Sequence, residues 1–400
     1  MQHSPCAGRL DNMKTKLHWS DLALAVLFLG ILYAVFVINI FKPADKLSFS
    51  ERRKLAQFPE ITVENILNKK SMDGFDNYSV DQIAFRENYR RLKAIFDINV
   101  LFKSDNNAIF VSGDQVFKTE YPMNQNSARR LCDVINYVYR QFLEGMNVHY
   151  ALVPDKNYYL EDTRHLIMDY PEYASFVREH IQDDIGYIDL FGELTLDSYY
   201  MTDSHWKQDR LAGVVDAIAA GLGSPMRFDE SIYTRESYSP FYGVYYGQSA
   251  LNVKPDEITY LVSSATENAV VTSVEQPGAV LSVYDLSVLG EMDSYNMFML
   301  GPQAIVRAEN PGSASGRELI IIRDSYASSL SPLFLPGYDA VTLVDLRYIL
   351  PNLLGQFIDF TNQDVLFLYS TTLFNNSDSI KSPPQEAFVS PFLARAALGG

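Results

Sequence analysis

Residues 319–344 read LIIIRDSYASSLSPLFLPGYDAVTLV, in which two apolar runs enclose a segment of mixed composition. Short apolar runs bounded by turn residues are typical of buried strands, so we predict strands at 319–322 and 340–344. The segment between them predicts a helix at 327–335. A strand, a helix and a second strand in this order form the unit that joins parallel neighbours in a sheet.

The same alternation continues on both sides of this unit. Strands that alternate with helices predict an α/β fold with a mainly parallel sheet, covered by helices on both faces. The further elements that we expect are helices at 126–143, 171–181, 207–222 and 350–358, and strands at 148–153, 186–190 and 365–369.

A segment of different texture, 223–316, interrupts the alternation. Runs rich in β-branched residues at 258–262, 269–274 and 279–283 predict antiparallel hairpins inserted into the α/β domain. Further upstream, Ser112-Gly113-Asp114 lies between two apolar runs and predicts another hairpin.

These elements predict one α/β domain over residues 106–374. The preceding segment, 42–105, begins as a charged stalk and continues as a helical lead-in, with apolar residues at helical spacing over 67–101. The last segment, 375–400, is polar and contains Pro383-Pro384. We expect it to be a loose C-terminal tail.

A transmembrane helix is expected at residues 22–41, which read LALAVLFLGILYAVFVINIF without a charged side chain. About 20 such residues span the hydrocarbon core of a bilayer, and the run is longer than a cleaved signal peptide needs. Basic residues on both flanks leave the orientation open. We prefer a short cytoplasmic tail at 1–21 and an extracellular C-terminal domain, as in a single-pass protein of the bacterial cell membrane.

Composition excludes one class of partner. The formal net charge is −16, which leaves no basic surface to neutralise phosphates, so nucleic acid is not expected to bind. Cys6 and Cys132 flank the membrane segment and should lie on opposite sides of the bilayer, unpaired. No Cys/His cluster has metal-ligand spacing, and we predict neither a metal nor another cofactor.

Two strand ends carry residues suited to nucleophilic catalysis. Open α/β sheets place their sites at the C-terminal ends of strands. Ser325 follows the strand at 319–322 and precedes a helix, so its hydroxyl is placed for attack on a carbonyl. Asp203 and His205 precede the helix at 207–222, and a carboxylate beside an imidazole makes a general base. Helix capping is the structural alternative for each motif.

A third strand end supplies a cation. Arg347 follows the strand at 340–344, where a guanidinium can bind an anion or the oxygen of an acyl group or sugar. The structural alternative is an ion pair between Arg347 and Asp345. A nucleophile, a base with its carboxylate and a cation would all meet at one edge of a parallel sheet. The three groups together are stronger evidence for a catalytic site than any one motif alone.

Several segments, in this order, resemble a known family. They are FSERRKLAQFPE at 49–60, TDSHW at 202–206, FYGVYYGQS at 241–249, IIRDSY at 321–326 and VDLRY at 344–348. Together they look like the DHHW family of bacterial envelope proteins. They are also similar to the alginate O-acetyltransferase group of SGNH-like hydrolases.

The resemblance implies a fold and a set of catalytic residues. The fold would be the three-layer fold of SGNH hydrolases, with the β-rich insertion added. In the alginate group an Asp-x-His-Trp motif and an Asp-Ser motif supply the triad, which here would be Asp203, His205 and Ser325. Two positions depart from the pattern: Ser204 replaces the first His of DHHW, and Arg323 replaces the Gly of the usual Gly-Asp-Ser.

The resemblance also implies a reaction. We expect a membrane-anchored extracellular O-acetyltransferase or acetylesterase that acts on cell-surface polysaccharide or wall glycan, with the acetyl group supplied by a membrane protein of the MBOAT type. Arg347, Tyr326, Arg323 and Trp206 are the candidates for contact with the substrate or the oxyanion.

The alternative is a non-catalytic glycan-binding or envelope-assembly protein. It would use the same cleft together with Tyr242, Tyr245 and Tyr246 of the insertion.

Overall fold

The computed structural model describes residues 19–161 and 164–383. Within this range the chain forms two compact units. The first contains residues 19–48 and 53–89. The second contains 49–52 and everything from residue 90 onward.

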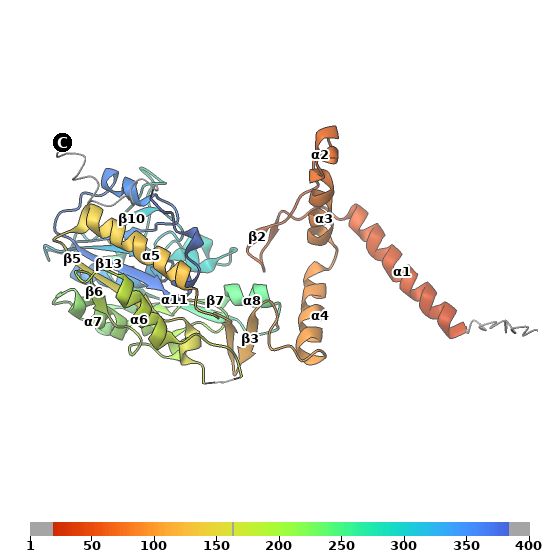
Figure 1. Cartoon of the computed structure of the whole chain (residues 1–400), viewed down its shortest axis with the longest axis horizontal. Coiled ribbons are helices and arrows are strands. Elements are labelled where there is room, and N and C mark those ends of the chain that lie inside the picture. Colours follow the sequence, from red (N-terminus) through yellow and green to blue (C-terminus); the bar gives the residue numbers. More distant parts are fainter. Residues whose placement is uncertain (1–18, 162–163, 384–400) are drawn as a thin grey trace, which may run out of the picture. The chain divides into compact units, whose positions relative to one another are not determined.

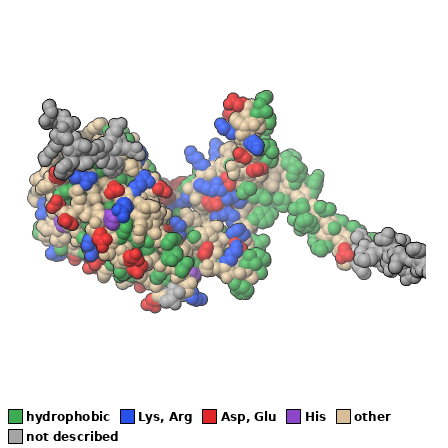
Figure 2. All heavy atoms as spheres, in the orientation of Figure 1, with side chains coloured by type: hydrophobic (Ala, Val, Ile, Leu, Met, Phe, Trp, Pro, Cys, Tyr) green, Lys and Arg blue, Asp and Glu red, His purple; other side chains and the backbone are tan. Residues whose placement is uncertain are grey.

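The first unit begins with a long apolar helix, α1 (Trp19–Phe41), which has no buried residue. By length and composition α1 is able to cross a membrane, and it contains the predicted segment 22–41. Figure 2 shows hydrophobic side chains along the whole of α1. An apolar helix of this length that buries no residue is a candidate for a membrane span or a signal sequence.

The rest of the first unit is a short hairpin and helices. The hairpin pairs β1 (Leu47–Ser48) with β2 (Arg53–Lys54). It is followed by α2 (Val63–Leu67), α3 (Lys70–Gln82) and the start of α4 (Arg86–Asn99). The single helical run expected over 67–101 is therefore wrong. Phe85 has a φ of +62°, which no right-handed helix accommodates, so the chain turns between α3 and α4.

The second unit is built on a seven-stranded sheet with the order β6-β5-β13-β11-β12-β10-β9 (Figure 1). The first five strands in this order are parallel, and β10 and β9 extend the sheet by antiparallel pairing. The strands are β5 (Asn147–Val153), β6 (Gly186–Ile188), β9 (Val270–Ser273), β10 (Ile305–Glu309), β11 (Glu318–Arg323), β12 (Ala340–Val344) and β13 (Asp364–Ser370).

Two cores lie on the two faces of this sheet. Along β11, Leu319 and Ile321 face one core, while Ile320 and Ile322 face the other. The first core is closed by α7 (Ala212–Gly221) and α10 (Tyr326–Leu330), and the second by α5 (Gln125–Val138) and α6 (Tyr170–His180). A strand buried on both faces reads as a continuous apolar run, as β11 does. The predicted three-layer α/β fold is confirmed.

The insertion differs in part from its prediction. Its first half is the expected hairpin, formed by β7 (Thr234–Phe241) and β8 (Asp256–Val262). Its second half is not a separate layer, because β9 and β10 join the main sheet. The predicted strand 279–283 forms only an isolated bridge, between Leu281 and Val271. The exposed edge of β12 explains the difference, since its unpaired backbone groups are satisfied by β10.

Three predicted helices are shorter than expected. The run 207–222 starts as a 3₁₀ turn before α7, and 327–335 becomes a 3₁₀ helix after α10. The run 350–358 is entirely 3₁₀, at Pro351–Gln356. Pro332 accounts for the second, because it lacks the N–H that the interior of an α-helix needs. Pro351 is at the first position of its helix, where a proline is tolerated, so it does not explain the third.

The remaining elements frame the domain. The predicted hairpin is confirmed as β3 (Ile109–Ser112) and β4 (Gln115–Lys118). The short helices are α8 (Val244–Ser249), α9 (Ser264–Glu267) and α11 (Thr371–Asn375).

The loose tail expected from residue 375 is wrong for the residues described. Ile380 is only 1% exposed and belongs to the second core. The Ser127 hydroxyl of α5 accepts from the Ser377 backbone N–H at 2.6 Å. A buried apolar side chain and hydrogen bonds to α5 hold this segment in place. The rest of the predicted tail, 384–400, lies outside the described residues.

Candidate active site

Ser325 lies at the carboxyl end of the central strand β11, at the start of α10. It has helical dihedral angles, and its side chain makes no capping hydrogen bond. The hydroxyl oxygen instead lies 2.7 Å from His205 Nε2. The capping alternative for Ser325 is therefore not what the geometry shows.

Asp324 fixes the turn that presents Ser325. One of its carboxylate oxygens accepts from the Tyr326 backbone N–H at 3.1 Å, and the other accepts from the Ser370 backbone N–H at 2.8 Å. These bonds join the end of β11 to the end of β13. A local side-chain bond of this kind is the usual reason for Asp in a tight turn.

Asp203 and His205 lie in the loop before α7. His205 Nδ1 is 2.6 Å from Asp203 Oδ1, and the His205 backbone N–H donates to the same oxygen at 3.0 Å. With Nδ1 as the donor, Nε2 is left as an acceptor for the Ser325 hydroxyl proton. Hydrogen bonds of 2.6 and 2.7 Å thus connect a carboxylate, an imidazole and a hydroxyl in series, the geometry of an activated serine.

Asp203 is fully buried, yet its surroundings keep it ionised. Burial acts to raise the pKa of Asp203, but the charges of His205 and Arg52 and the hydrogen bond from the Val244 backbone outweigh it and hold the pKa well below its usual value. Val244 N–H donates to Asp203 Oδ2 at 2.8 Å, and an Arg52 nitrogen lies 3.7 Å from that oxygen. The carboxylate is thereby available to stabilise an imidazolium.

Arg52 is a site residue that the sequence did not single out. Its guanidinium donates to the Tyr242 carbonyl at 3.0 Å and pairs with Asp293 at 3.0 Å. The residue has a φ of +53°. Its only signal in the sequence is its place in the FSERR segment, which contributed to the family resemblance.

The His205 ring is held by aromatic side chains. Tyr295 stacks on it with ring centroids 3.9 Å apart and an angle of 12°, and Tyr326 lies at 5.0 Å. The Tyr295 hydroxyl is 2.8 Å from Ser329 Oγ, which anchors the stacked ring to α10. Nothing in the sequence around Tyr295 indicated this role.

Two of the residues expected at the substrate are committed to the interior. Trp206 is fully buried, and its indole N–H donates to the Tyr326 carbonyl at 3.0 Å and to Ser329 at 3.1 Å. Tyr326 is 4% exposed, and its hydroxyl donates to the Ser204 carbonyl at 2.6 Å. The expected substrate contacts are therefore wrong for both. Their hydrogen bonds instead join the His205 loop to the Ser325 helix.

Replacing Trp206 with phenylalanine is expected to lower the free energy of unfolding by about 1–3 kcal/mol, because two buried acceptors lose their donor. Chemical denaturation of the full-length chain in detergent measures this. The other tryptophan, Trp19, is 86% exposed on α1. Its replacement by phenylalanine is the matched control, and equal stability of the two variants would contradict the anchoring role of Trp206.

Arg323 and Arg347 share one buried carboxylate. Arg347 forms a bidentate pair with Asp345, with distances of 2.9 and 2.6 Å. Arg323 is 1% exposed, donates to the Gly301 carbonyl at 2.9 Å and lies 3.5 Å from Asp345. The expected substrate or oxyanion contact is wrong for Arg323. For Arg347 the structure shows the alternative stated above, an ion pair with Asp345.

A buried lysine lies under the His205 loop. Lys156 is 2% exposed, and its ammonium donates to the carbonyls of Tyr200, Met201 and Asp203 at 2.9–3.0 Å. The ammonium also lies over the rings of Phe117 and Tyr245. Three carbonyls converging on one cation fix the backbone that carries Asp203.

Replacing Lys156 with methionine is expected to slow serine acylation at least about tenfold and to lower stability by about 3–5 kcal/mol, because the three carbonyls lose a buried charged donor. Burial lowers the pKa of Lys156 to about 7 against the opposing charges of Asp203 and Asp256. Since the unfolded chain then binds more protons between pH 7 and 10, native stability should rise with pH across that window.

The free energy of unfolding of the wild type relative to that of Lys156→Met, measured at several pH values, tests whether stability rises with pH. Lys254→Met, at an exposed position, is the control. A stability difference that stays constant from pH 7 to 10 would contradict the lowered pKa.

A cavity of about 260 Å³ flanks the Asp203 side of the site. Arg52, Tyr242, Gly243 and Tyr246 are among its lining residues. The Tyr242 and Tyr246 rings are 4.5 Å apart, whereas Tyr245 is buried. Of the three tyrosines expected in a glycan-binding cleft, two are thus at a surface.

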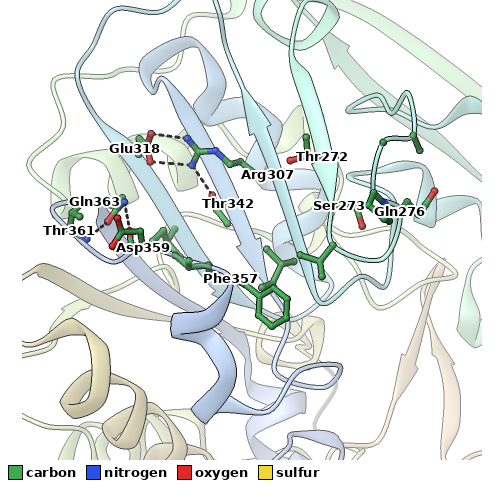
Figure 3. Close-up of a pocket in the computed structure, with 17 residues that line it drawn as sticks. Thr272, Ser273, Gln276, Arg307, Glu318, Thr342, Phe357, Asp359, Thr361 and Gln363 are labelled. Atoms are coloured by element: carbon green, nitrogen blue, oxygen red, sulfur yellow. Dashed lines mark hydrogen bonds and ion pairs between the residues drawn. The ribbon is translucent and has the colours of Figure 1, made fainter.

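A second cavity, of about 690 Å³, lies over the sheet where β9, β10, β11 and β12 run side by side (Figure 3). Arg307 projects across it and pairs with Glu318 at 2.7 Å, with Thr342 beside it. None of Asp203, His205 and Ser325 lines this cavity. It is separate from the triad.

No group of three or more His, Cys, Asp or Glu side chains able to hold a metal is found in the described residues, 19–161 and 164–383. Cys132 is a free, buried thiol. Cys6, which we expect to lie on the other side of the bilayer and not to pair with Cys132, is outside the described residues.

Comparison with known proteins gives matches in structure. The domain matches the crystal structure of a DHHW family protein from Eubacterium siraeum with a TM-score of 0.59 and 19% identity, over 70% of this chain and 98% of that chain. The fold is that of a DHHW family protein. Scans of protein-family models and of curated proteins give no match.

PatB1 from Bacillus cereus is a second structural neighbour of this DHHW-like fold. Its TM-score is 0.55 at 18% identity, over 66% of this chain and 96% of that chain. PatB1 with a sulfonyl adduct matches with a TM-score of 0.53 at 18% identity, over 66% of this chain and 97% of that chain. At these identities the comparisons establish the fold, and the predicted resemblance to the DHHW family is confirmed at that level.

Proposed function

We propose that this protein is a membrane-anchored extracellular O-acetyltransferase or acetylesterase that acts on cell-surface polysaccharide or wall glycan. The observation that carries the proposal is the chain of short hydrogen bonds from Asp203 through His205 to Ser325. Three residues, of which the last is 120 positions from the second, meet at the carboxyl end of a parallel strand, where α/β folds hold their active sites.

In the proposed reaction Ser325 Oγ attacks the carbonyl carbon of an acetyl ester, and its proton moves to His205 Nε2. Asp203 stabilises the imidazolium that forms. The ester C–O bond breaks, His205 returns the proton to the departing oxygen, and an acetyl-serine remains. A sugar hydroxyl, or water, then loses its proton to His205 and attacks the acetyl carbonyl carbon. The bond between that carbon and Ser325 Oγ breaks, and His205 returns the proton to Ser325 Oγ.

The oxyanion is assigned to the backbone. We propose the Ser325 N–H, at the start of α10, as one donor to the developing negative charge. Arg347 is a weaker candidate for an oxyanion donor than its sequence position indicated, because its Nε and Nη2 atoms both donate to Asp345.

The proposed setting is the outer face of a bacterial cell membrane. α1 would be the single anchor, with the α/β domain outside and a membrane protein of the MBOAT type as the acetyl donor. The support is α1, a helix of 23 residues with no buried residue, in which the segment 22–41 has no charged side chain. A reporter fused after residue 400 that is active only in the cytoplasm would contradict this topology.

The test is covalent labelling of the full-length chain in detergent with a sulfonyl fluoride probe, together with acetate release from p-nitrophenyl acetate. The structure of PatB1, a structural neighbour, has been solved with a sulfonyl adduct. Labelling at Ser325, located by mass spectrometry, supports the proposal. Absence of both labelling and acetate release counts against it.

The second candidate is a glycan-binding or envelope-assembly protein without catalysis. The observation that favours it is the cavity of about 260 Å³ lined by the Tyr242 and Tyr246 rings, since tyrosine faces are common in sugar sites. Glycan binding by a chain that the probe does not label would select this candidate. Loss of binding on replacement of Tyr242 by alanine would locate it.

A further inference from the structure

The helix α4 is amphipathic, but its charged side is packed against the protein and its apolar side is exposed. Its inner face, which packs within the second unit, carries two charged side chains and an alanine. Arg90 donates to the Gly247 carbonyl at 2.6 Å, Ala94 is fully buried, and Asp97 is 6% exposed. These three residues follow the spacing i, i+4, i+7 and so share one side of the helix. A surface helix of a soluble domain normally buries its apolar side instead.

The opposite side of α4 carries an apolar stripe in contact with solvent. We call Tyr89, Leu92, Ile95 and Phe96 of α4, with Val100 directly after the helix, the outer stripe. Their exposed fractions lie between 42% and 63%. Tyr89, Leu92 and Phe96 are spaced i, i+3, i+7, which places them on one face. In Figure 2 hydrophobic side chains gather over α4. Contiguous exposed apolar surface on a helix indicates an interaction site.

Charge favours a lipid surface as the occupant. From Arg86 to Asn99 the helix has four basic and two acidic side chains, whereas the whole chain has a net charge of −16. Arg91 is exposed and donates to the Tyr246 hydroxyl at 3.1 Å, and Lys93, whose side chain is 61% exposed, pairs with Asp97 at 3.0 Å. Apolar side chains flanked by Lys and Arg are the composition of helices that lie in the interface of an anionic membrane.

The position of α4 in the chain favours the same occupant. Within the first unit, the Ala84 backbone N–H donates to Asn39 Oδ1 at 2.7 Å. Asn39 is in the last turn of α1, and Ala84 lies two residues before α4 begins. The start of α4 is thus tied to the end of the apolar helix, at the level where a membrane-spanning α1 leaves the hydrocarbon.

We propose that α4 lies on the bilayer surface, with the outer stripe among the lipid headgroups and upper acyl chains and its polar face bound to the α/β domain. The proposal rests on α1 being the membrane anchor, as proposed above, and is independent of catalysis. The partner is a bilayer with anionic headgroups. The consequence is a domain held against the membrane by two contacts rather than one.

The experiment places a fluorophore at single cysteines of the full-length chain in lipid nanodiscs. The sites are Leu92→Cys and Phe96→Cys, in a Cys6→Ser background. Cys132 can remain, because burial raises the pKa of its thiol to about 12 and leaves it unreactive. Glu230→Cys, with a side chain 70% exposed in the α/β domain, is the control.

Nitroxide lipids labelled near the headgroup are expected to quench the fluorophore at positions 92 and 96 roughly twofold or more beyond position 230, because an interfacial helix sits about 5–10 Å deep. Quenching should increase with the fraction of anionic lipid and weaken with salt.

Quenching at positions 92 and 96 no greater than at position 230 would overturn the proposal. So would self-quenching between copies at position 96 without quenching by lipid, which would assign the stripe to a second copy of the chain. A chain that does not enter nanodiscs at all would contradict the proposal that α1 is a membrane anchor. That result is distinct from a failure of the proposal that the outer stripe contacts lipid. The double variant Leu92→Ser/Phe96→Ser, probed at Ile95→Cys, should lose the lipid quenching while Ser325 still reacts with the sulfonyl probe.

Discussion

Replacing Ser325 with alanine is expected to abolish covalent labelling and to lower acetate release by at least about 10³-fold, the usual loss when a triad nucleophile is removed. The reason is specific to the geometry. Ser325 Oγ lies 2.7 Å from His205 Nε2 and caps no helix, so its removal takes away the nucleophile without a structural hydrogen bond to α10.

The variant is also expected to fold normally. Alanine fits the helical dihedral angles of residue 325, and the turn itself is held by Asp324. Ser331→Ala, which removes a hydroxyl from the 3₁₀ helix that follows α10, is the matched control and should keep full labelling. Undiminished labelling of Ser325→Ala, or a label found on another residue, would contradict the assigned nucleophile.

Replacing Asp203 with asparagine is expected to lower kcat by about 10⁴-fold, as the same change does in serine hydrolases in which the carboxylate orients the histidine. Both oxygens of Asp203 accept hydrogen bonds, Oδ1 from His205 and Oδ2 from Val244. An asparagine has one oxygen and one NH₂, so one of these two partners must face a donor. If that partner is His205, the imidazole takes the tautomer in which Nε2 carries the proton and cannot accept one from Ser325.

Steady-state kinetics with p-nitrophenyl acetate, on chains whose unfolding transition matches that of the wild type, measure this loss. Asp293→Asn is the control, because Asp293 also pairs with Arg52 but is not part of the hydrogen-bonded chain from Asp203 through His205 to Ser325. We expect its kcat to fall by less than about tenfold, a change of up to about 1.4 kcal/mol in the activation barrier. An Asp203→Asn chain that is folded and retains a tenth of wild-type kcat would contradict the role given to Asp203.

The candidate catalytic residues could be selected from the sequence for a local reason. A strand that is apolar on both faces, as at 319–322, ends where polar residues begin, so its end can be located in the sequence. Asp324-Ser325 lies at that end. The loop of Asp203 and His205 stands before a helical run in the same way. Parallel strands gather such ends at one edge, so candidate residues can be proposed without coordinates.

The support of the site was not visible in the same way. Arg52, Lys156 and Tyr295 come from three segments with no catalytic motif, and each contacts the triad or its loop through tertiary packing. Trp206 and Tyr326 were expected at the substrate because they adjoin His205 and Ser325. Being adjacent to His205 or Ser325 in sequence does not determine the direction in which the Trp206 and Tyr326 side chains point after the two loops pack together.

Local sequence pattern was enough to predict the three-layer fold, the apolar helix α1 and the strand end that carries Ser325, because hydrophobic periodicity reflects which faces are buried. Long-range packing, in contrast, was needed to show that β9 and β10 extend the main sheet and that α4 turns its apolar stripe outward. It also decided that the carboxylate of Asp203 stays ionised in the interior. Those outcomes depend on backbone hydrogen bonds and charges from distant segments, whose energies appear only when the chain brings them within a few ångströms.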